Sequence, residues 1–266
     1  MMFGLWRKWR RRQWTHKNIP SSWLRILEDE VSFYKALPSE KRDDFLTKLH
    51  WFVREKFFLG AQGMEITDRV KVIIGAAAAR LILYLDYQHY DKLTEIVVYP
   101  FDYLHPNDDD SIRFGEAHTW GVVVLSWEAI QREMKYDSWR DTISHEFAHV
   151  LDVYNGSFNG TPQLRKRDDY KRWAEVMQSQ FEELRSGDPD LMYLLGDYAA
   201  KNEAEFFAVG TEAFFGQPRL FKEIAPDVFA EFRTFFGWSP PDPNPEPAWE
   251  LSSIPVWMDV QQKLWA

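Results

Sequence analysis

The apolar positions near the start of the chain follow a helical period. From Pro20 to Phe58 they return every three or four residues, as in helices that bury one face. The Leu37–Pro38 step interrupts this period, because proline disfavours a helical conformation in the residue before it. The pattern therefore predicts two helices, with Ser39 capping the second. Residues 70–87 are apolar on nearly all sides, which predicts a helix inside the core.

Two short segments rich in β-branched residues follow and predict strands. They are EIVVY at Glu95–Tyr99 and GVVVLSW at Gly121–Trp127. Helical spacing then returns in three further segments, at Trp139–Tyr154, Arg167–Leu184 and Asp197–Phe215. This order of helices, a small sheet and more helices indicates an α+β fold that is mainly helical.

Both ends of the chain differ in composition from its middle. Residues 1–18 combine tryptophans with six basic side chains and no acidic one. The prolines of WSPPDPNPEPAWE, after Gly237, disfavour regular structure, so this segment is either an extended strap docked by its tryptophans or a loose tail. We expect a basic tail at 1–18, one compact domain at 19–238 and a proline-rich strap at 239–266.

Composition limits the classes to which the protein can belong. The 266 residues are 45% hydrophobic, as in a folded domain, and the net charge of -9 disfavours binding to nucleic acid. The basic tail is the exception, since it suits an anionic membrane surface or an acidic partner, unless it is simply a disordered start. Because no segment fits a signal peptide or a membrane span, we expect a cytoplasmic protein.

The sequence contains no cysteine, which restricts any metal site to imidazole and carboxylate ligands. His145, Glu146 and His149 form an HExxH motif within a predicted helix. Residues four apart share a helix face, so both imidazoles can bind one ion, while Glu146 beside them can act as a general base. The apolar neighbours of the motif favour this interpretation over two structural histidines, because a chance match on a solvated helix would lack them.

A catalytic zinc ion usually takes three protein ligands, so a carboxylate must complete the site. The segment from Tyr198 to Phe215 offers Glu203, Glu205 and Glu212. On a helix Glu203 and Glu205 point to nearly opposite sides, so at most one of them faces the metal. Glu205 and Glu212 share a face but lie about 10 Å apart along the axis, so only one of them can be a ligand.

Two carboxylates are candidates for supporting the ligands. Asp152 lies on the histidine face of its helix and could accept a hydrogen bond from a ligand imidazole, or interact with the end of its own helix. Glu212 could support the ligands in a similar way, or it could be an ordinary solvated carboxylate.

The second predicted strand is a candidate for substrate binding. An edge strand beside a metal site can pair with the backbone of an extended peptide and hold it in place. The alternative is an inner strand of the core. The residues concerned are Gly121, Val122, Val123 and Val124.

The two motifs together resemble known families. HEFAHVLD, followed roughly fifty residues later by YAAKNEAEFFA, is similar to the metal-binding half of anthrax lethal factor. From its tryptophan- and arginine-containing start through QGMEI, VVYP, GVVVLSW and NGTP, the chain resembles the Mlc titration factor A family of bacterial zinc peptidases. The resemblance implies a zincin-like metallopeptidase fold with an HExxH active-site helix.

The same resemblance implies a role for each site residue. His145, His149 and Glu205 would bind one zinc ion in a gluzincin-like set. Glu146 would be the general base, and Tyr198 would stabilise the oxyanion. The implied function is peptide hydrolysis by an aminopeptidase-like or endopeptidase enzyme, linked to regulation of glucose phosphotransferase genes. The alternative is a protein that sequesters the transcriptional repressor of the glucose system, with hydrolysis secondary.

Overall fold

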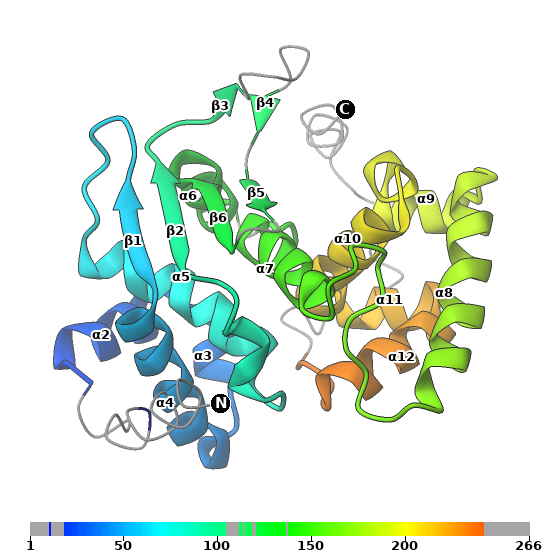
Figure 1. The fold of residues 1–266 in the computed structure, drawn as a ribbon, viewed down its shortest axis with the longest axis horizontal. Coiled ribbons are helices and arrows are strands. Elements are labelled where there is room, and N and C mark those ends of the chain that lie inside the picture. Colours follow the sequence, from blue (N-terminus) through cyan, green and yellow to red (C-terminus); the bar gives the residue numbers. More distant parts are fainter. Residues whose placement is uncertain are drawn as a thin grey trace. The chain divides into compact units, whose positions relative to one another are not determined.

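The computed structural model of the chain describes residues 11, 19–104, 112–113, 115–118, 121–136 and 138–241. The chain forms two compact units, one of residues 1–132 with 142–150 and one of residues 133–141 with 151–266 (Figure 1). The predicted tail and strap fall almost entirely outside the described residues, so the division into tail, domain and strap stays a prediction. Within the described part of the chain, no helix is long and apolar enough to cross a membrane.

The helices of the first unit largely follow the predicted pattern. They are α2 (Ser21–Glu30), α3 (Ser32–Ala36), α4 (Ser39–Glu55), α5 (Asp68–Leu81) and the short 3-10 helix η2 (Tyr87–Tyr90). The predicted break at Leu37–Pro38 is confirmed, but Val31 adds a second break through its extended backbone. The predicted cap is wrong, because the hydroxyl of Ser39 donates to Glu40 and makes no capping bond to α4.

The buried helix predicted at residues 70–87 is shorter in the structure. α5 ends at Leu81, and the Lys48 ammonium donates to three carbonyl oxygens just beyond it, those of Ile82, Leu83 and Leu85. Lys48 therefore connects α4 to the turn that follows α5, although burial lowers its pKa to about 8.

The sheet of the first unit has the strand order β1-β2-β6-β5. β1 (Phe57–Gly60), β2 (Glu95–Tyr99) and β6 (Val122–Ser126) run parallel, and β5 (Gly115–His118) pairs antiparallel with β6. The two predicted strands are thus confirmed as β2 and β6, whereas β1 and β5 are additions. A separate antiparallel pair consists of β3 (Tyr103–Leu104) and β4 (Ile112–Arg113).

The prediction that Gly121, Val122, Val123 and Val124 belong to an edge strand is wrong. From Val122 to Leu125, β6 pairs with β2 on one side and with β5 on the other. The backbone groups of β6 are therefore engaged within the sheet and cannot pair with a peptide substrate. Among the described residues, the outer strands of this sheet are β1 and β5.

Helix α7 (Thr142–Val153) carries the HExxH motif, and α6 (Trp127–Lys135) precedes it. The ring of Phe147 contacts the rings of Phe52 and Tyr90, with centroids 5.4 Å apart in both pairs. Arg80 on α5 donates to the hydroxyl of Ser144 at 2.7 Å. Phe147 lies two residues from each histidine and so on a different side of the helix, which turns the histidines away from this aromatic cluster.

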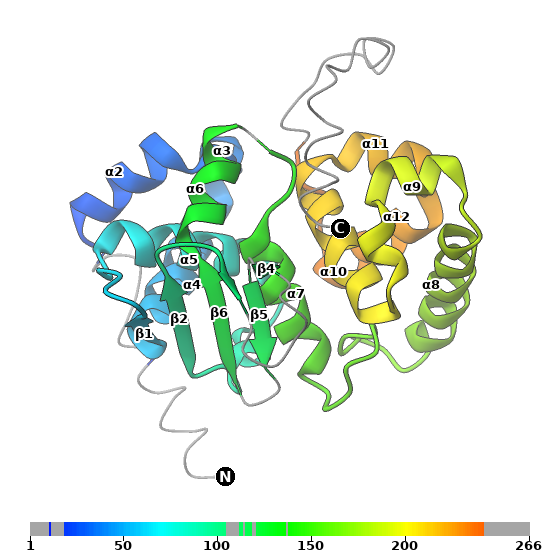
Figure 2. The same cartoon turned by 90° about the horizontal axis from the view of Figure 1, so that it is seen from above.

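The second unit is built around one central helix. Its helical segments are α8 (Asp169–Arg185), α9 (Pro189–Leu195), η3 (Asp197–Ala200), α10 (Glu203–Gly216), α11 (Pro218–Ile224) and α12 (Pro226–Phe236). α10 contacts each of the others and is buried from Ala204 to Phe215 (Figure 2). Aromatic rings fill the space around it, among them Trp173 stacked on Phe232.

We expect Phe147→Ala to lower the free energy of unfolding by about 3–5 kcal/mol, because it removes a buried ring from a packed cluster. Urea unfolding followed by circular dichroism measures the change. Phe101→Ala is the matched control, since the ring of Phe101 is 65% exposed and its loss should cost less than about 1 kcal/mol. Equal losses in the two variants would contradict the role given to Phe147.

Candidate metal centre

The two histidines of the HExxH motif lie together on one face of α7. Both side chains are buried, and their Nε2 atoms are 3.2 Å apart. The rings stand nearly perpendicular, with an interplanar angle of 82°. The helical period thus brings two imidazole nitrogens to one point, as the four-residue spacing predicts.

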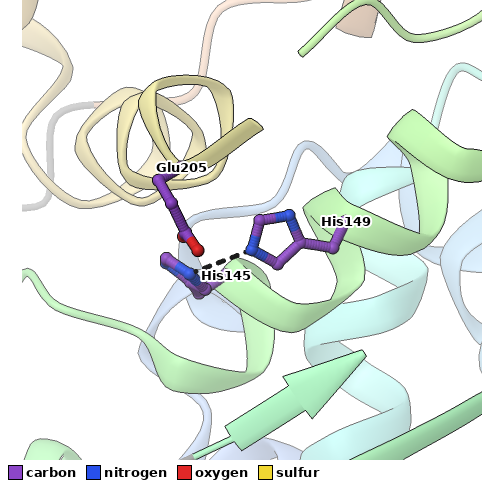
Figure 3. A group of neighbouring side chains, drawn as sticks. All are labelled: His145, His149 and Glu205. Atoms are coloured by element: carbon purple, nitrogen blue, oxygen red, sulfur yellow. Dashed lines mark hydrogen bonds between the residues drawn. The ribbon is translucent and has the colours of Figure 1, made fainter. Parts of the chain in front are cut away.

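Glu205 is the carboxylate that the structure groups with these histidines. One nitrogen of His145, one nitrogen of His149 and one carboxylate oxygen of Glu205 all lie within 4.8 Å of one another (Figure 3). Glu203, two residues earlier on α10, is exposed. Over the described part of the chain, this is the one cluster of three or more potential metal-binding side chains.

The donor set of this cluster suits a tetrahedral divalent ion. Two nitrogens bound to one zinc ion at about 2.0–2.1 Å stand about 3.3–3.4 Å apart. The separation of the two Nε2 atoms, 3.2 Å, is close to this value. The same distance fits an N–H···N hydrogen bond between the rings, so metal binding would displace a proton that they share. A carboxylate as the third donor leaves a fourth position for water.

Tyr198 contacts Glu205, but the two residues lie on different helical segments and not on the single helix predicted. The helix predicted at Asp197–Phe215 is divided into η3 and α10, so the two residues are not on one helix. The division falls at Asn202, whose side chain accepts a hydrogen bond from the backbone N–H of Glu205 and thereby begins α10. The hydroxyl of Tyr198 nevertheless donates to Oε1 of Glu205 at 3.2 Å.

Glu146 follows His145 directly on α7, and its side chain is buried. A carboxylate in this position lies at the side of the histidine face and not on it, because successive helical residues differ by about 100° in direction. It therefore suits a role in proton transfer better than a role as a third ligand.

The two supporting carboxylates predicted from the sequence contact backbone N–H groups. Oδ2 of Asp152 accepts a hydrogen bond from the N–H of Gly160 at 2.9 Å. Glu212 accepts one from the N–H of Asp141, also at 2.9 Å, and forms an ion pair with Arg140. The predicted contacts to ligand imidazoles stay predictions. The observed hydrogen bonds connect Asp152 to the loop after α7 and Glu212 to the residue just before α7.

The pKa of Asp152 is higher than that of an ordinary aspartate. The residue is completely buried, and burial raises its pKa to about 6, although the nearby backbone N–H groups, first that of Gly160, act in the opposite direction. Burial also lowers the pKa of Arg140, with Glu212 opposing that change. Both ends of α7 thus adjoin ionisable groups held in surroundings of low polarity.

Two residues that fix this site were not identified from the sequence. Asn202 caps α10 next to the candidate ligand, and Gly160 receives Asp152. Each carries a recognisable signal. Asn202 stands three residues before a glutamate, as in a capping box, and Asn159–Gly160 is a turn dipeptide.

We expect Asp152→Asn to remove a pH-dependent loss of stability from the metal-free protein. The pKa of Asp152 is higher in the folded chain, about 6, than in the unfolded chain, so its stabilising protonation is lost as pH rises from about 4 to about 7. The asparagine variant should gain up to about 3 kcal/mol relative to wild type over this range. Urea unfolding of chelator-treated protein at both ends of the range measures the difference, and parallel pH profiles would refute it.

Comparisons with known proteins place the chain in a family of metallopeptidases. The sequence profile of the glucose-regulated metallo-peptidase M90 family matches residues 6–237. An uncharacterized protein of Synechocystis is 32% identical over 252 residues, which cover 88% of this chain and 90% of that protein. The Mlc titration factor A of Edwardsiella ictaluri is 29% identical over 225 residues, covering 79% of this chain and 85% of that protein.

A further relative, the Mlc titration factor A of Yersinia pestis, is 28% identical over 203 residues, covering 71% of this chain and 74% of that protein. The matched region includes the HExxH helix and the segment with Glu205. The resemblance to the Mlc titration factor A family that the motifs predict is therefore confirmed, and the chain belongs to the glucose-regulated metallo-peptidase M90 family.

Proposed function

We propose that the protein is a zinc peptidase in which His145, His149 and Glu205 bind one zinc ion. The observation that carries this proposal is the buried cluster of two imidazoles and one carboxylate within 4.8 Å. Membership of a metallopeptidase family agrees with a hydrolytic site. With HExxH followed by a glutamate ligand, the proposed set is gluzincin-like.

The chemistry of the site divides between the ion and the side chains. A bound zinc ion supplies Lewis acidity, which polarises water and the substrate carbonyl group. The carboxylate of Glu146 accepts the proton of the attacking water and delivers it to the leaving amine nitrogen. Burial of Glu146 excludes bulk water, which would otherwise compete for this proton.

Tyr198 has two alternative acceptors in this mechanism. Its hydroxyl donates to Oε1 of Glu205 at 3.2 Å, and a phenol has only one proton to donate. To stabilise an oxyanion, the hydroxyl has to turn from Glu205 toward the substrate. Tyr198 would thus hold the Glu205 carboxylate before substrate arrives and stabilise negative charge afterwards.

An extended substrate would pair with β5 and not with β6. β6 is engaged on both sides, whereas β5 is an outer strand and lies beside α7 in both views (Figures 1 and 2). Addition of a peptide to an outer strand uses its remaining backbone N–H and C=O groups. We therefore assign peptide pairing to Gly115–His118. This pairing leaves both kinds of peptidase open. An endopeptidase binds substrate residues on both sides of the scissile bond, whereas an aminopeptidase binds a chain that extends from it on one side only.

A second candidate function is binding to a transcriptional repressor in the cytoplasm. It is favoured by the name of the relatives, Mlc titration factor A, and by the description of the family as glucose-regulated. Binding to a repressor would use a surface and need no hydrolysis. A variant that keeps the metal but lacks the general base separates the two functions.

We expect Glu146→Gln to retain zinc and to lower peptide hydrolysis by about 10²–10⁴-fold, because the amide cannot accept the proton of water. Metal content by plasma emission spectrometry and turnover of a fluorogenic peptide library are the two measurements. A variant that hydrolyses as fast as wild type would refute the role of Glu146. If the inactive variant still relieves repression in cells, binding is the cellular function.

We expect Glu205→Ala to lose zinc and Glu203→Ala to keep it. Both residues lie in the first turn of α10, but only Glu205 is buried with the histidines, which makes Glu203 the matched control. Loss of one ligand of three should weaken zinc binding by more than about 100-fold. Competition with a chromogenic chelator measures the affinity. Full zinc retention in Glu205→Ala would exclude the proposed ligand set.

A further inference from the structure

Asp152 is a buried carboxylate whose partner lies in the loop after α7. It stands three residues beyond His149 and is 0% exposed. Its Oδ2 atom accepts the hydrogen bond from the N–H of Gly160. In the described part of the chain its other oxygen, Oδ1, has no hydrogen-bond partner. Burying a carboxylate with one oxygen unpaired costs free energy. The hydrogen bond to Gly160 is the interaction that this buried carboxylate supplies, which indicates a structural role for the position of Gly160.

Gly160 makes two hydrogen bonds and one close backbone contact. Its N–H donates to Asp152, and its carbonyl oxygen accepts a hydrogen bond from Nε1 of Trp173 at 3.2 Å. Its backbone has a φ of +69°, a conformation that favours glycine. A Cβ atom at this position would lie 2.2 Å from the carbonyl oxygen of Glu203. The backbone of Gly160 therefore packs directly on the backbone of Glu203, with no room for a side chain.

Glu203 is the first residue of α10, and the turn that it begins carries Glu205. Asn202 also fixes this turn, because its side chain accepts the N–H of Glu205 at 2.9 Å. The place of Glu205 is therefore set by two supports, the Asn202 cap and the backbone contact with Gly160. All these residues belong to the second unit, whose internal packing fixes their arrangement.

We propose that Asp152 is a positioning residue for Glu205: by holding Gly160 against the carbonyl of Glu203, it sets where the first turn of α10 lies. This inference rests on the proposed function, in which Glu205 is a zinc ligand. It gives Asp152 a role other than the contact to a ligand imidazole expected from the sequence. The C-terminal end of α7, which belongs to the second unit, thereby helps to fix Glu205 within that unit.

The test compares Asp152→Ala with Asp152→Asn in the full-length protein. Asparagine keeps an oxygen that can accept the Gly160 N–H, whereas alanine does not. We expect the alanine variant to bind zinc about 10–100-fold more weakly and the asparagine variant to bind close to wild type. The visible absorption of the cobalt-loaded proteins reports ligand geometry, and its bands should shift only in the alanine variant.

Leu27→Ala is the control for a general loss of stability. Leu27 is a fully buried residue of α2 in the first unit, so its truncation weakens the fold without touching the Gly160 loop. Zinc affinity and the cobalt spectrum should stay those of wild type. If they change as in Asp152→Ala, the effect of Asp152 is general stability and the inference is wrong.

The remaining outcomes separate this inference from the proposed function. If Asp152→Ala binds zinc as wild type does while Glu205→Ala loses it, the inference fails and the proposed function stands. If Glu205→Ala keeps zinc, both fail. Equal losses in the alanine and asparagine variants would mean that charge matters and positioning does not, which also overturns the inference.

Gly160→Ala keeps the inference testable should Asp152→Ala not fold. Its added Cβ would displace the carbonyl of Glu203, so we expect a comparable loss of zinc affinity. A folded Gly160→Ala protein with wild-type zinc affinity would overturn the inference.

Discussion

The burial of α7 is the constraint on which the candidate site depends. The helix has an aromatic contact face at Phe147 and a face with His145 and His149, and both faces are buried. Buried polar groups require partners, because each unpaired one loses its hydration without compensation. Two imidazoles 3.2 Å apart meet that requirement through a shared proton or a shared metal ion. Placing HExxH inside the protein thus requires that the two imidazoles share either a proton or a metal ion.

The same requirement explains the carboxylates at the two ends of α7. Asp152 near its C-terminal end accepts the Gly160 N–H, and Glu212 accepts the N–H of Asp141 just before its start. Glu212 lies on α10, and Gly160 packs against the first residue of α10. Both attachments therefore lead to the helix that carries Glu205. Within the second unit, both contacts thus restrain segments that pack on α10.

Sequence reasoning succeeded where a local period carries the information. β2 and β6, the break before α4 and the HExxH helix all follow from spacing within about a dozen residues. It failed where the outcome depends on distant segments. β6 is an inner strand because β5 pairs with it, and the β5 sequence has no strong strand pattern. The helix predicted at Asp197–Phe215 is divided because the Asn202 side chain competes for the backbone of the next turn.

The sequence by itself determined the chemistry of this protein: two imidazoles one helical turn apart, a neighbouring carboxylate, no thiolate, and a later segment with three candidate glutamates. Covalent spacing and residue type suffice for that, because a helix converts sequence distance into direction. Residue spacing left three glutamates open and the family resemblance implied Glu205; the tertiary structure groups Glu205 with the two histidines. It also gave Asp152 a backbone partner, Gly160. The grouping of Glu205 with the histidines depends on packing between segments roughly fifty residues apart in the chain, and the Asp152 contact depends on how the loop after α7 turns back. No local period encodes either one.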